Sequence, residues 1–186
     1  DAPNIGGYVE RGSLHSVALI LEDVDSDGMS INTSGRVAGN VDVKVGVGFS
    51  FLMLEGGIDA SGEQGGTVKI DEGGDIHIGG TINTSSSDSH SGDVFLSALR
   101  IYITGSILAQ ARGAADNNGG HVHLGGYEGV SVRGGRILTD APNIGGYVER
   151  GSLHSVALIL EDVDSDGMSI NTSGRVAGNV DVKVGV

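Results

Sequence analysis

The chain contains the same stretch of sequence twice without a single difference. Residues 1–47 are identical to residues 140–186, so the pattern returns after 139 positions. Repeats of this regularity are typical of arrays in which each unit packs only on its neighbours. A compact domain with one asymmetric site has no use for such a copy. We therefore interpret residues 1–186 as one continuous segment of a periodic structure, and not as two domains.

A shorter and imperfect repeat lies inside the long one. Its marker is one or two small residues followed by valine, any residue and an apolar residue, as at 66–70, 92–96 and 120–124. The marker valines occupy positions 9, 41, 68, 94, 122 and 148. Their spacings of 32, 27, 26, 28 and 26 residues sum to 139, so five short repeats make one long repeat.

Each short repeat contains three groups of apolar residues, with a spacing of two inside a group. One repeat has Val68 and Ile70, then Ile76 and Ile78, then Ile82. This spacing predicts β-strands, the glycine-rich pairs between groups predict turns, and no helical periodicity is present. The sequence therefore predicts an all-β parallel β-helix, or β-solenoid, with three strands per coil and about five coils per 139 residues.

The predicted core is thin and regular, because the chain has 34 glycines and only 4% aromatic residues. Small β-branched side chains should stack in one inward row per strand, with neighbouring coils about 4.8 Å apart. The residues that we assign to these rows are Val68, Val94, Val122, Ile76, Ile101, Val130, Ile82, Ile107 and Ile137. We attribute the glycines to corners that need a positive φ and to close stacking of turns. The main competing fold is a β-sandwich, which favours more aromatic residues and hairpin signals.

Charge and composition narrow the classes of partner. The formal net charge is −13, which disfavours nucleic acids and anionic membranes as partners. The chain has no cysteine, so no disulfide framework exists. Its apolar runs are far shorter than the roughly 18–20 residues of a membrane helix, so we expect no membrane insertion.

Three phrases of the sequence, at 74–85, 103–110 and 34–41, resemble the repeats of filamentous-haemagglutinin-like bacterial exoproteins, the β-helical passengers of two-partner secretion. The resemblance covers nearly the whole chain. It implies a right-handed β-helix at the cell surface or outside the cell, used as a shaft in adhesion or matrix. It transfers no active residue. Shafts of that family usually contain diverged repeats, so the identical copies indicate a tandem-repeat or filament-forming relative.

An acidic segment is the main candidate for a metal site. Asp23, Asp25 and Asp27 alternate ahead of a glycine, and the segment recurs as Asp162, Asp164 and Asp166. Alternating carboxylates on a tight loop can converge on Ca²⁺, as in the first half of a calcium-binding loop. The second half does not fit, because the twelfth position is Ser34 and not glutamate. An acidic surface loop without a bound ion is the alternative.

Other polar residues offer weaker candidates. His121 and His123 flank Val122 and share one strand face, where two imidazoles can bind Zn²⁺ or Cu²⁺, but a third ligand is not evident. Exposed histidines without metal are the alternative. Thr33, Thr84 and Thr139 each follow a third apolar group, either as a ladder that orders water or as turn residues with local hydrogen bonds.

An enzyme is the least favoured class. The polysaccharide lyases that use β-helices need clustered aspartate, lysine and arginine, whereas the lysines here are only Lys44, Lys69 and Lys183. We therefore expect no catalysis and no cofactor other than calcium. The sequence predicts a structural segment of an extracellular or cell-surface filament, with copies of itself or the continuation of the same chain as partners. The alternative is an adhesin shaft whose outward loops bind glycans or host surfaces, with Tyr8, Tyr102 and Tyr127 as loop contacts.

Overall fold

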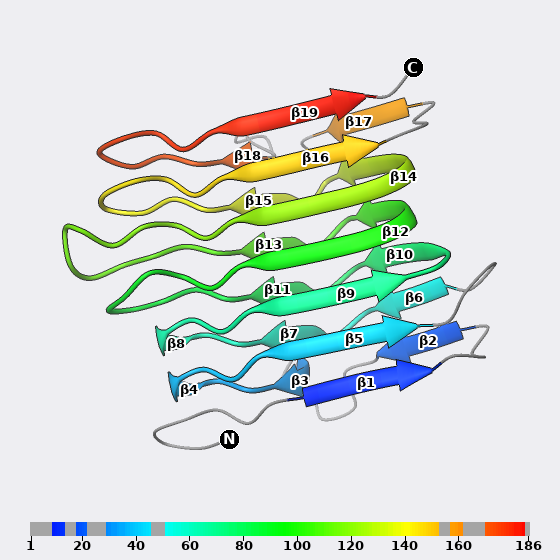
Figure 1. The fold of residues 1–186 in the computed structure, drawn as a ribbon, viewed down its shortest axis with the longest axis horizontal. Helices are drawn as coiled ribbons and strands as arrows, with labels where there is room; N and C mark the ends of the chain where they lie inside the picture. The colour runs from blue at the N-terminus through cyan, green and yellow to red at the C-terminus, as the bar shows by residue number, and fades with distance from the viewer. Residues whose placement is uncertain are drawn as a thin grey trace.

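The computed structural model contains strands, turns and loops (Figure 1). It describes the backbone of residues 9–13, 18–21, 29–45, 51–152, 157–161 and 170–184, and the side chains of residues 31–45, 51–148 and 170–181. Within these ranges the chain forms no helix, and so none that is long and apolar enough to cross a membrane. Every pairing between the described strands is parallel, and the strands stack coil upon coil.

Nineteen strands are described, and they fall into an 11-stranded sheet, a 6-stranded sheet and a pair. They are β1 (Val9–Ser13), β2 (Ala18–Leu21), β3 (Met29–Asn32), β4 (Gly35–Val37), β5 (Val41–Val45), β6 (Phe51–Leu54), β7 (Gly57–Asp59), β8 (Gly62–Gln64), β9 (Val68–Glu72), β10 (Asp75–Ile78), β11 (Thr81–Asn83), β12 (Val94–Ile103), β13 (Ser106–Leu108), β14 (Val122–Arg133), β15 (Arg136–Leu138), β16 (Val148–Ser152), β17 (Ala157–Glu161), β18 (Ile170–Asn171) and β19 (Val180–Val184).

The marker valines form a single row up the solenoid. Val9 pairs with Val41, and the row continues through the valines at 68, 94, 122, 148 and 180 without a change of register. The spacings read from the sequence are therefore the number of residues between consecutive rungs. The last step, from 148 to 180, has the same length as the first because the sequence has repeated.

Two further rows also belong to the interior. Ile76 pairs with Leu52 below it and Ile101 above it, and Ile82 pairs with Ile58 and Ile107 in the same way. All nine residues assigned to the core from the sequence are buried, with exposed fractions of 3% or less. Because strand side chains alternate, the residues between them point outward. One apolar cluster therefore runs through the described coils, as expected from the spacing of two.

The glycines serve close stacking more than positive φ. Among the described glycines only Gly113 and Gly134 have a positive φ, so the expectation that corners generally need it was wrong. Instead, a Cβ on Gly92 would overlap the carbonyl oxygen of Gly66 in the coil below, and a Cβ on Gly120 would overlap that of Gly92. These glycines let successive coils approach to strand-pairing distance where the chain enters the first strand of each coil.

Some of the predicted turns are absent. In the coil that begins at Val68, Gly73 and Gly74 separate β9 from β10, as expected. In contrast, β12 and β14 each continue through the equivalent corner, with only a shift of register between Ala98 and Arg100. The corner of β12 contains no glycine, whereas that of β14 contains Gly125, Gly126 and Gly129, and the two strands stay paired around it.

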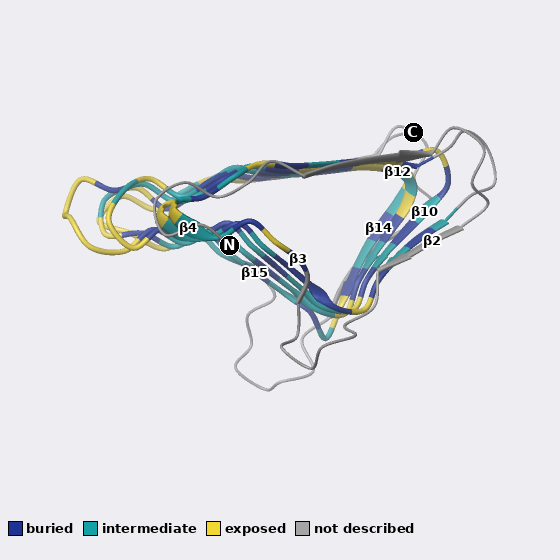
Figure 2. Ribbon diagram, turned by 90° about the horizontal axis from the view of Figure 1, so that it is seen from below, coloured by how far each residue is buried: buried dark blue, intermediate teal, exposed yellow. Residues whose placement is uncertain are grey.

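Viewed along the stack, the coils superimpose in a triangular outline, from one corner of which loops extend (Figure 2). The all-β class and the parallel β-solenoid predicted from the sequence are confirmed. Right-handed coiling and the count of three strands per coil stay predictions. The long apolar alternation from Val41 to Met53 passes through residues 46–50, which lie outside the described residues.

Candidate functional site

A group of charged side chains in contact with one another lies on the outer face of β10, β12 and β14. On this face Asp75, Arg100 and Gly129 follow one another across three coils. The Arg100 Nε donates to Oδ1 of Asp75 at 2.9 Å, and Arg100 Nη2 lies 2.9 Å from Asp75 Oδ2. Glu128 Oε2 lies 3.8 Å from Arg100 Nε on the other side. The hydrogen bond and charge of Asp75 are the main causes that raise the pKa of Arg100.

The next outward row contains an aromatic stack. His77 and Tyr102 are register partners, and their rings stack with centroids 4.6 Å apart and planes inclined by 24°. The partner of Tyr102 in the following coil is Ser131, which is much smaller. One face of the tyrosine ring is therefore covered by His77, whereas the other face borders a gap in the row of large side chains.

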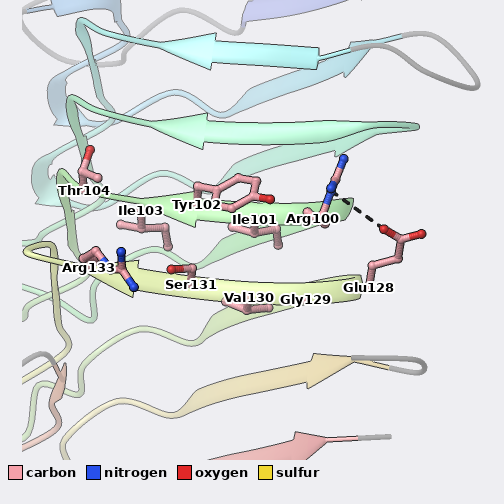
Figure 3. Close-up of a pocket in the computed structure, with 10 residues that line it drawn as sticks. All are labelled: Arg100, Ile101, Tyr102, Ile103, Thr104, Glu128, Gly129, Val130, Ser131 and Arg133. Carbon is pink, nitrogen blue, oxygen red and sulfur yellow. Dashed lines mark ion pairs between the residues drawn. The ribbon is translucent and has the colours of Figure 1, made fainter. Parts of the chain in front are cut away.

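This gap is a groove of about 440 Å³ along β12 and β14 (Figure 3). It exists because Gly129 and Ser131 lie beside Arg100 and Tyr102, so small residues follow large ones in both outward rows. Its lining residues are Arg100, Ile101, Tyr102, Ile103, Thr104, Glu128, Gly129, Val130, Ser131 and Arg133. Charged groups stand at both ends, with Arg100 and Glu128 at one and Arg133 at the other (Figure 3).

The sequence prediction did not identify this groove. Tyr102 and Tyr127 were expected on loops, but both lie within strands, Tyr102 in β12 and Tyr127 in β14. Arg100 and Glu128 were not singled out, because they are 28 positions apart and meet only when two coils stack. The available signal was the pair of small residues, Gly129 and Ser131, at outward positions of a strand.

The histidines at the start of β14, on another side of the triangular coil, lie together, as predicted from their spacing. The rings of His121 and His123 are 6.2 Å apart between centroids and nearly perpendicular, and Phe95 contacts both. Tyr147 of the next coil packs against His121 with centroids 4.8 Å apart. Among residues whose side chains are described, no three potential ligands gather to hold a metal. The described arrangement is an aromatic surface cluster.

The threonines that follow strands of the 6-stranded sheet are buried turn residues. Thr33 and Thr84 are at most 1% exposed, and their hydroxyls donate at 2.9 Å to the carbonyl oxygens of Gly39 and Gly92. Each hydrogen bond joins the two ends of a protruding loop. A water-ordering ladder at the surface is therefore ruled out at these positions, and the local hydrogen bonds predicted as its alternative are confirmed.

The remaining candidates divide between described and undescribed parts of the chain. Both copies of the acidic segment, with Asp23, Asp25 and Asp27 and with Asp162, Asp164 and Asp166, lie outside the described residues, as does His15. His90 lies in a described loop, where its Nδ1 accepts a hydrogen bond from the backbone N–H of Asn118 at 2.9 Å.

The chain was compared with family models, curated proteins and solved structures, and none of them matches it. The resemblance to filamentous-haemagglutinin-like repeats therefore stays an expectation from the sequence, and the functional argument depends on the fold and its surfaces.

Proposed function

We propose that residues 1–186 are a structural segment of an extracellular β-solenoid filament, or of a giant tandem-repeat surface protein. Support comes from the pairing of the two identical stretches. Val9 pairs with Val41 and Val148 with Val180 in the same register over five residues. After 139 residues the chain thus returns to the same rung geometry, so the coil can be repeated without limit.

The proposed mechanism is mechanical. Each coil covers the strand edges of the coil below it, so backbone donors and acceptors are paired along the whole shaft. A second source of stiffness is the continuous apolar core, in which Ile76 and Ile82 contact like residues above and below. An array of this kind resists bending, because bending must separate strands on one side.

Location and partners follow from the same proposal. The sequence resemblance and the absence of cysteine suit a chain exported to the cell surface or beyond. Its partners are copies of itself, end to end, or the continuation of one long chain. The net charge of −13 keeps neighbouring fibres apart by like-charge repulsion.

Two measurements test this proposal. Fibre diffraction from the assembled protein should give a meridional spacing of about 4.8 Å, the distance between coils. The mass of fully denatured filaments should then distinguish subunits near one repeat in length from one very large chain. A protein that stays monomeric at high concentration, and is recovered only as short chains from its source, would refute the filament.

One observation favours a second candidate, an adhesin shaft that binds glycans. The groove on β12 and β14 combines an aromatic ring, Tyr102, with charged groups at both ends. The sequence predicted binding through the outward loops, whereas this groove lies on a sheet face. Screening the intact chain on a glycan array tests it, and absence of binding to every glycan would reject it.

A further inference from the structure

We propose that the groove between β12 and β14 binds a neutral, hydroxyl-rich oligosaccharide segment, with Tyr102 as its stacking platform. This inference gives the adhesive alternative a definite site on a sheet face, away from the loops. It is independent of filament assembly, because every residue that lines the groove belongs to two neighbouring coils of one chain.

The dimensions suit a short linear ligand. The groove runs along the strands from Arg100 to Thr104, which at 3.3 Å per residue spans roughly 13 Å. Its volume of about 440 Å³ lies within the range of small-molecule sites, roughly 300–1,000 Å³. An elongated site of this size accommodates several sugar rings in line better than a single compact ligand.

Tyr102 is prepared for stacking before a ligand arrives. His77 covers one face of the ring, which fixes its orientation, and the other face borders the groove above Ser131. A preoriented aromatic ring loses little conformational freedom on binding. Its apolar face matches the C–H face of a pyranose, and its hydroxyl, which points toward Arg100 in Figure 3, is available for a polar contact.

The polar groups at the Arg100 end of the groove match hydroxyl groups better than charges. Arg100 is already bound to Asp75 through two contacts of 2.9 Å and lies near Glu128, so its charge is compensated. Glu128 accepts hydrogen bonds, and the Ser131 hydroxyl can donate and accept. The Thr104 hydroxyl donates to the carbonyl oxygen of Ile78 at 3.4 Å and can still accept. A polyanion would also meet the acidic surface of a chain with a net charge of −13.

A peptide added as a further strand does not fit this site. The backbones of β12 and β14 pair with each other from Val94 to Ile103, so the groove floor offers no free strand edge. Strand addition requires such an edge. Recognition must therefore use side chains, as stacking on Tyr102 does.

Recurrence of the groove along the proposed array favours binding of a long polysaccharide. In the proposed array the groove recurs every 139 residues, which is five rungs or about 24 Å along the shaft. A long polysaccharide can occupy several grooves at once, so weak individual sites give high overall avidity. Avidity of this kind compensates for weak binding at each single groove.

The test is calorimetric titration of the intact 186-residue chain with cellohexaose, xylohexaose and chitohexaose at millimolar concentrations, against a heparin-derived hexasaccharide and a polyproline peptide. The variant Ser131→Tyr fills the groove with a ring stacked on Tyr102. Its matched control is Ser97→Tyr, the same change at an exposed outward position of β12 away from the groove. A second variant, Tyr102→Leu, removes the platform but keeps a strand-compatible side chain.

We expect at least one neutral hexasaccharide to bind the parent chain and the Ser97→Tyr control equally, and binding to be lost in Ser131→Tyr. Tyr102→Leu should weaken binding roughly two- to tenfold, the usual range for one aromatic contact. Thermal unfolding of each variant verifies folding, and Tyr102→Leu decides the question if Ser131→Tyr does not fold. The proposal is overturned if no neutral sugar binds, if only the acidic sugar or the peptide binds, or if both groove variants bind unchanged.

Discussion

Val41 and Val180 are the same residue in two identical stretches of sequence, yet Val41 is 1% exposed and Val180 is 48% exposed. Each pairs with the equivalent valine of the coil below, Val9 and Val148. The difference lies above them: β9 pairs with β5 over Val41, whereas β19 pairs only with β16 among the described strands. Burial of this valine is therefore decided by the neighbouring coil.

This difference predicts unequal effects for one substitution. Val41→Ala should lower the free energy of unfolding by about 2 kcal/mol, because it removes two buried carbon atoms and leaves a cavity. In the isolated 186-residue chain, Val180→Ala should cost less than about 1 kcal/mol, because no described strand pairs above this half-exposed side chain. Urea titrations of both variants in dilute solution make the comparison, and an unchanged stability of Val41→Ala would contradict the burial of Val41 by β9.

The interior row of β12 predicts a larger loss. Ile101 is fully buried between Ile76 and Val130, so Ile101→Ala should destabilise the chain by about 2–5 kcal/mol. Ser97→Ala, on the outer side of the same strand, should change stability by no more than about 0.5 kcal/mol. Thermal unfolding followed by circular dichroism measures both. A mild Ile101 variant would show that the inward row is wrongly assigned.

Backbone contact between coils predicts a glycine requirement at position 92. Gly92→Ala should cost about 1–3 kcal/mol, because the new methyl group overlaps the Gly66 carbonyl and two coils must separate locally. Gly125→Ala is the control, since its Cβ would meet the movable ring of His123 at 3.1 Å and the Leu96 carbonyl oxygen at 3.6 Å. If both changes were tolerated equally, the coils would be farther apart at Gly92 than the structure shows.

The ion pair on the groove face predicts a small effect that depends on salt. Asp75→Asn should lower stability by less than about 1 kcal/mol at low ionic strength, and the difference should vanish near 1 M salt, because Arg100 is half exposed. Asp75 raises the pKa of Arg100. The contribution of this ion pair to folding stability is therefore fully present below the pKa of arginine in the unfolded chain, and it is lost only as the pH rises through the pKa in the folded chain. Arg100 stays charged at every neutral or mildly alkaline pH, so the effect of Asp75→Asn should not change over that range. A loss that persists in high salt would mean that Asp75 acts through packing.

The repeated acidic segment predicts calcium binding that can be counted. If the carboxylates converge, calorimetry should detect two Ca²⁺ ions per 186-residue chain, and the double variant Asp25→Ala with Asp164→Ala should bind none. Asp88→Ala, which changes an acidic residue in a different loop, is the control and should keep both ions. Binding that is absent in the parent chain, or unchanged in the double variant, would leave only an acidic surface loop.

Several features of the fold were accessible from the sequence because they depend on local periodicity. Val68 and Ile70 alternate with Lys69 and Asp71, so one face of the strand must turn inward. The commensurate spacing of the marker valines also set the register between coils. The continuous corner of β14 was missed, because strand pairing with β12 holds the chain extended where the pair Glu128 and Gly129 predicted a turn.

The sequence alone therefore determined which residues of each coil face the core, since hydrophobic burial acts on an alternation that is visible in neighbouring positions. Only the tertiary structure decided which outward residues meet. Asp75 reaches Arg100, and Tyr102 faces Ser131, across separations of 25 and 29 positions that no local pattern encodes. The groove and the ion pair are products of stacking, because the register between coils changes by one residue at the corner that precedes this face.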